Sequence, residues 1–96
     1  MNKDNIDKLN QLVGEFFDRN PKVAWIPAKE MMQPLIENGI FKKDEKKGLP
    51  LRKVLRSLDK EDQLDQIPLL HAERNGNDVY WYFVQEGSVF QSSDVP

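Results

Sequence analysis

The sequence of residues 69–84 is LLHAERNGNDVYWYFV, and this stretch predicts a β-hairpin. Its Asn-Gly pair favours a tight reversal in which the backbone takes positive φ angles. Both flanks are rich in residues that are typical of strands. Side chains alternate across a strand, so Val79, Trp81 and Phe83 share one face. We expect this face to pack on the rest of the protein, because the tyrosine hydroxyls of the other face prefer water.

Two stretches with helical spacing of apolar residues lie in the first half of the chain. The first covers residues 4–18, and the second covers residues 28–38. Between them, residues 23–26 form a short run that is typical of an edge strand. Pro34 lies inside the second stretch and predicts an irregular turn there, since proline has no N–H to donate.

A third helix is predicted over residues 50–60, with Pro50 in its first turn. At 100° per residue its apolar side chains fall within an arc of about 100°; they are Leu51, Val54, Leu55 and Leu58. Four basic side chains fall within a similar arc on the opposite side; they are Arg52, Lys53, Arg56 and Lys60. We therefore expect one face to enter the core and the other to form a basic ridge.

The charges of the chain are unevenly distributed along the sequence. Residues 42–60 hold eight basic groups against three acidic ones, whereas residues 61–96 hold one basic group against seven acidic ones. The basic block includes the ridge and a polar connector that precedes it, with Lys42, Lys43, Lys46 and Lys47. Although the net charge is −2, such asymmetry can create a positive binding face.

The 96 residues fit a single domain, which we place at residues 1–85, with a flexible tail at residues 86–96. The chain has no cysteine, and no apolar run approaches the roughly 20 residues of a membrane span. No phosphate loop, nucleophile elbow or calcium loop is present. We therefore expect a cytoplasmic binding protein that is not an enzyme, with no cofactor, no small-molecule substrate and no membrane contact.

The predicted order of elements is helix, strand, helix, helix, strand, turn, strand. This α+β arrangement resembles the winged helix-turn-helix superfamily over about residues 5–85. Residues 24–27 match its first strand, and residues 28–41 match its positioning helix. PLRKVLRSL at residues 50–58 matches its recognition helix, and the hairpin at residues 69–84 matches its wing. No invariant motif defines this superfamily, so the resemblance implies architecture more directly than function.

The resemblance implies that the third helix enters the major groove of double-stranded DNA. By position, Arg52 and Arg56 would then face base edges, where guanidinium groups pair with guanine. Lys53, Lys60 and the connector lysines would contact phosphates. At the tip of the wing, Arg74 is the one basic residue, and it lies in the sequence beside acidic residues.

Two other interpretations of the basic block remain open. A run of charge is often only a solvated face of a helix. The acidic last third and the aromatic strand instead favour a protein-interaction domain, acting as a homodimer or docking a partner by strand addition at a sheet edge.

Overall fold

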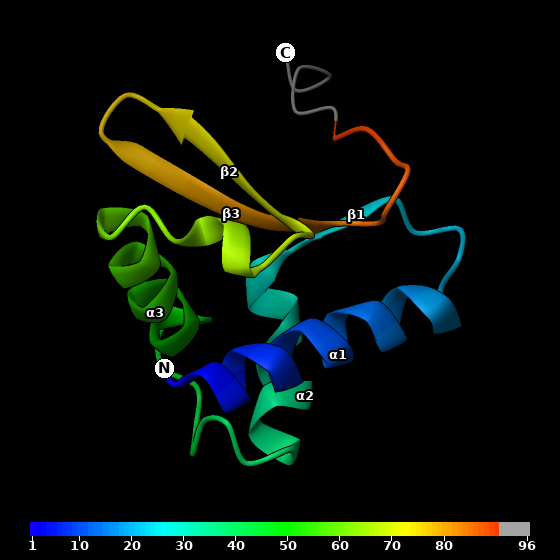
Figure 1. Cartoon of the computed structure of the whole chain (residues 1–96), viewed down its shortest axis with the longest axis horizontal. Coiled ribbons are helices and arrows are strands. Elements are labelled where there is room, and N and C mark those ends of the chain that lie inside the picture. Colours follow the sequence, from blue (N-terminus) through cyan, green and yellow to red (C-terminus); the bar gives the residue numbers. More distant parts are fainter. Residues whose placement is uncertain (91–96) are drawn as a thin grey trace.

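The computed structural model describes residues 1–90 and has an α+β fold with a three-stranded antiparallel sheet (Figure 1). Its three α-helices are α1 (Lys3–Arg19), α2 (Met32–Glu37) and α3 (Leu49–Lys60). Its strands are β1 (Trp25–Pro27), β2 (Leu70–Asn75) and β3 (Asp78–Val84). Two short 3-10 helices complete it, η1 (Ala28–Met31) and η2 (Leu64–Gln66). The predicted order of helices and strands is confirmed.

The second predicted helix is divided into two parts, as Pro34 suggested. Residues 28–31 form η1, and the α-helical part begins only at Met32. This places Pro34 in the first turn of α2, where a missing N–H leaves no helical bond unmade. Gly39 closes the helix with a φ of 76°, and the N–H of Ile40 donates to the carbonyl of Leu35 at 2.9 Å.

The strands are ordered β1-β3-β2, so the last strand lies in the middle of the sheet. β2 and β3 pair along their whole lengths, from Leu70 opposite Phe83 to Asn75 opposite Asp78. Gly76 takes the positive φ that the hairpin turn requires. β1 pairs with only the last three residues of β3, Tyr82–Val84.

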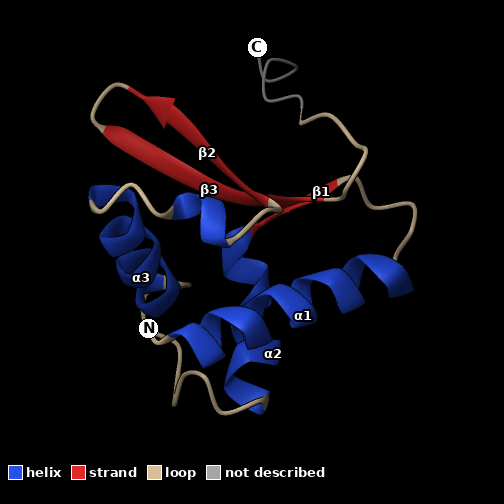
Figure 2. Cartoon of the chain, viewed as in Figure 1, coloured by secondary structure: helices blue, strands red, loops and turns tan. Residues whose placement is uncertain are grey.

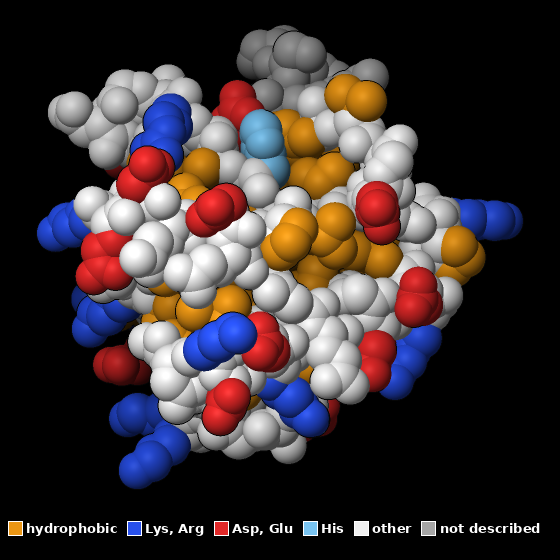
Figure 3. Space-filling model, viewed as in Figure 1, with side chains coloured by type: hydrophobic (Ala, Val, Ile, Leu, Met, Phe, Trp, Pro, Cys, Tyr) orange, Lys and Arg blue, Asp and Glu red, His pale blue; other side chains and the backbone are white. Residues whose placement is uncertain are grey.

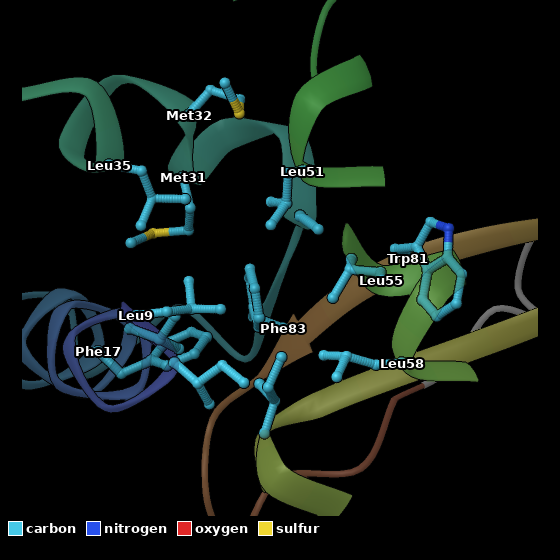
Figure 4. Close-up of a cluster of buried hydrophobic side chains, with 14 residues drawn as sticks. Leu9, Phe17, Met31, Met32, Leu35, Leu51, Leu55, Leu58, Trp81 and Phe83 are labelled. Carbon is cyan, nitrogen blue, oxygen red and sulfur yellow. The ribbon is translucent and has the colours of Figure 1, made fainter. Parts of the chain in front are cut away.

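The helices lie on one side of the sheet, as Figure 2 shows, and the core fills the space between them. Phe83 is fully buried at the centre of this core, and Trp81 lies beside Leu55 and Leu58 (Figure 4). Val79 is half-buried on the same face. The expectation that the tryptophan face of β3 packs inward is therefore confirmed.

The outer face of the sheet carries a second, smaller group of aromatic side chains. The ring of Phe90 lies 5.0 Å from that of Trp25, 4.5 Å from that of Tyr82 and 4.6 Å from that of His71, measured between ring centroids. Residues 86–90, predicted as the start of a flexible tail, thus return to the sheet and end in a packed ring. The rest of the predicted tail, residues 91–96, lies outside the described residues.

Within residues 1–90, no helix has the length and apolar character that a membrane crossing needs.

Candidate nucleic-acid interface

The third helix has the two faces that its sequence predicts. Leu51, Leu55 and Leu58 are buried in the core. On the opposite face, Lys53, Arg56 and Lys60 are exposed, and in the described part of the chain none of them makes a hydrogen bond or an ion pair through its side chain. We call these three residues the α3 ridge. Figure 3 shows Lys and Arg side chains at the edge of the molecule that α3 and the preceding connector occupy, with acidic side chains among them.

The connector between α2 and α3 exposes four lysines, at positions 42, 43, 46 and 47. Asp44 and Glu45 lie among them, but the carboxylate of Asp44 is turned toward the backbone. Its Oδ1 accepts hydrogen bonds from the N–H groups of Glu45 at 2.8 Å and Gly48 at 2.7 Å. None of the four connector lysines forms an ion pair with a residue in the range 1–90.

The connector ends in a left-handed turn that is locked by side chains. Lys46, Lys47 and Gly48 have φ values of 48°, 50° and 97°, so three successive residues take a conformation that L-residues disfavour. Gly48 also passes close to η1, because a Cβ built on it would lie 2.8 Å from the Cβ of Lys29. Only glycine fits both requirements at position 48.

The side chain of Arg52 is hydrogen-bonded to this turn. Its Nη1 donates to the carbonyl oxygen of Lys47 at 2.8 Å, and its Nη2 donates to that of Lys46 at 3.2 Å. These two bonds direct the guanidinium group toward the connector, along the axis of α3. The predicted contact of Arg52 with base edges stays a prediction, and in the structure its guanidinium group links helix and connector.

Arg74 is also engaged within the protein. Its guanidinium group donates to both carboxylate oxygens of Asp59 on α3, at 2.8 and 3.1 Å. Those hydrogen bonds lower the pKa of Asp59 and raise that of Arg74, and charge attraction acts in the same direction. The phosphate contact predicted for Arg74 stays a prediction, and in the structure this residue ties the hairpin to α3.

Known proteins offer no guide to this surface. No family model, no curated protein and no solved structure matches the chain. The interface is therefore defined by its own residues, namely the α3 ridge and the connector lysines.

The hairpin lies next to the α3 ridge and lines a hollow with it. This hollow of about 410 Å³ is lined by Arg52, Arg56, Asn77, Asp78, Val79 and Tyr80. Tyr80 is 48% exposed and points away from the core. A ligand on the ridge at Arg56 would thus meet the hairpin as well, including one acidic side chain, Asp78.

Sequence reasoning did not anticipate the partners of Arg52 and Arg74. Asp59 lies fifteen positions before Arg74, and only the folded hairpin brings the two together. The hydrogen bonds of Arg52 depend on two successive left-handed lysines, which nothing in their residue type predicts. A signal did exist at Gly48, because glycine is the residue that takes a positive φ without steric cost.

Proposed function

We propose that the protein is a winged-helix module that binds double-stranded DNA through the α3 ridge and the connector lysines. The observation that carries the proposal is the seven exposed cations on α3 and the connector, which have no acidic partner within residues 1–90. The order of elements and the β1-β3-β2 sheet support the winged-helix arrangement.

In this proposal the cations have two tasks. Lysine ammonium groups contact phosphates, which supplies affinity without regard to sequence. Arg56 is the one arginine of the α3 ridge, and its guanidinium group has no partner within residues 1–90, so it is the candidate for reading a guanine edge in the major groove. A good bidentate contact of this kind contributes about 1–3 kcal/mol of discrimination between bases.

The experiment is a salt titration of binding to duplex DNA. Contacts to about five phosphates predict a slope of about −4.5 in a plot of log K against log salt concentration. Replacing the ridge by glutamine (K53Q/R56Q/K60Q) removes up to three of these contacts and should make the slope less steep by about 2.7.

The matched control is K3Q/R19Q/K22Q, which removes the same charge from exposed positions on and just after α1. We expect it to keep the wild-type slope. Absence of duplex binding at low salt, or an equal effect of the two triple variants, contradicts the proposal.

One observation favours a second candidate function, the docking of another polypeptide. β1 pairs with only three residues of β3, and within residues 1–90 no other strand pairs with that edge of the sheet.

A further inference from the structure

The central strand β3 has a free edge where β1 leaves the sheet. The N–H of Val84 donates to the carbonyl of Leu69 at 2.8 Å, and that of Gln85 donates to the carbonyl of Ala24 at 2.8 Å. Alternate residues of a strand direct their backbone groups to opposite sides. Even-numbered residues of β3 therefore bond to β2, and odd-numbered residues face the side of β1.

Val79 and Trp81 thus direct their N–H and carbonyl groups toward the side of β1, beyond the residues of β3 with which β1 pairs. The chain turns away at Pro27 and enters η1, so the register of β1 stops opposite Tyr82. The antiparallel pairing of Pro27 with Tyr82 requires the N–H of Ala28 to donate to the carbonyl of Trp81. Within the described residues, no strand pairs with Val79 on this side. Along this edge of β3, backbone N–H donors alternate with backbone carbonyl acceptors.

A hollow of about 240 Å³ lies along this free edge, between the hairpin, η1 and the start of α3. Its lining includes Val79, Trp81, Gly48 and two cations, Lys29 and Arg52. The absence of a side chain on Gly48 keeps the hollow open where the connector meets η1. No acidic side chain lines it.

The side chain of Trp81 holds a buried donor that has no partner within residues 1–90. The residue is 5% exposed, and its indole Nε1 is buried without a hydrogen-bond partner in the described part of the chain. Figure 4 shows the nitrogen-bearing edge of the indole turned away from Leu58. Buried donors of this kind are uncommon in folded proteins and call for an explanation such as a ligand.

The chemistry of the edge distinguishes between classes of ligand. A phosphate chain carries acceptors only and leaves the carbonyl of Val79 unpaired. A polypeptide in an extended conformation supplies donors and acceptors at the same spacing. Lys29 and Arg52 give the hollow a positive charge, which favours acidic side chains on that polypeptide.

We propose that an acidic peptide segment of a partner protein binds in this hollow as an added strand, antiparallel or parallel to β3 at Val79–Trp81. The added strand continues the sheet at the place where β1 ends. The site does not rest on the DNA proposal, because Lys29 and the β3 edge lie outside the α3 ridge.

The probe is a short, end-blocked, fluorescent peptide of alternating glutamate and valine, with binding followed by anisotropy. One control peptide has lysine in place of glutamate, and another is N-methylated on alternate residues so that it cannot complete a ladder. We expect the acidic peptide to bind and both controls to bind at least about tenfold more weakly.

Two protein variants test the site itself. Val79→Pro removes a donor that faces the free edge and leaves the bonds between β2 and β3 in place, so it should weaken binding about fivefold. Lys29→Glu reverses a charge in the hollow and should weaken binding of the acidic peptide about fivefold. Its matched control is Lys22→Glu, another exposed lysine, which should have no effect.

NMR gives a readout that does not depend on the variants. Binding should shift the backbone amides of Val79 and Trp81 and the indole N–H of Trp81, with the second indole signal assigned through Trp25→Phe. Shifts confined to the α3 ridge, equal binding of the lysine peptide, or no binding at millimolar peptide overturn the proposal.

A dimer in sedimentation whose Val79 and Trp81 amides are already protected from exchange would also overturn it, because a second copy would then occupy the edge. The triple ridge variant K53Q/R56Q/K60Q separates the two proposals. It should lose DNA binding and keep peptide binding, so that failure of one proposal is recognised independently of the other.

Discussion

Gly48 shows how a single residue positions the candidate interface. It combines a φ of 97° with a close approach to Lys29. We predict that Gly48→Ala destabilises the protein by about 2–4 kcal/mol, from backbone strain together with a Cβ that has no room. Denaturant unfolding followed by tryptophan fluorescence measures the loss.

Gly39 provides the matched control for this substitution. It has a φ of 76°, but a Cβ there would meet nothing within 4 Å. Gly39→Ala should therefore lower the free energy of unfolding by about 1 kcal/mol, because only backbone strain contributes. If both variants lose the same stability, the close approach of Gly48 to η1 has no energetic effect.

The pair of Asp59 and Arg74 makes stability depend on pH in a defined direction. The pKa of Asp59 is lowered in the folded state, mainly by its hydrogen bonds from Arg74. A carboxyl with a lowered pKa stabilises the folded state above its ordinary pKa, and the contribution is lost as the pH falls through the lowered value. We predict that Asp59→Asn is less stable than wild type at neutral pH and that the gap closes as the pH falls below the ordinary pKa of an aspartate.

Thermal unfolding across this pH range tests the prediction. Asp65→Asn is the control, since Asp65 is exposed and has no ion pair within the described residues. A gap between wild type and Asp59→Asn that stays constant on acidification would show that the ion pair does not contribute.

At the scale of elements, the segment after β3 is where sequence reasoning was least successful. Its glycine and serine favoured a flexible tail, whereas Phe90 packs against Trp25, Tyr82 and His71. We predict that Phe90→Ala destabilises the protein by about 1 kcal/mol. Val89→Ala, at a side chain that is 75% exposed, should change stability by less than about 0.5 kcal/mol. Equal stability of the two variants in denaturant titrations would refute a structural role for this ring.

The helices and the hairpin could be predicted because their signals are local. Leucines at helical spacing define the inner face of α3, and Pro34 marks the irregular start of α2. The Asn-Gly pair sets the hairpin turn. Phe90 could not be placed in the same way, because its partners come from three strands, and a lone aromatic residue in a polar stretch carries no periodicity.

At the scale of the molecule, the basic block of the sequence forms a positive surface, but two of the residues predicted for that surface have partners inside the protein. Of the nine cations assigned to DNA, Arg52 and Arg74 are held by internal partners, and the other seven are exposed. The sequence could identify the basic block. It could not show which guanidinium groups would be occupied, since their partners are backbone carbonyls and a carboxylate that only the fold brings near.

The β1-β3-β2 order also determines when the sheet can form during translation. β1 is synthesised before β3, and within residues 1–90 β3, which ends at Val84, is the one strand that pairs with it. Until that residue has left the ribosome, β1 has no strand to pair with and the apolar stripe of α1 has no Phe83 to pack on. Translation through Val84 therefore precedes completion of the sheet, and the nascent protein carries its apolar surface uncovered until then.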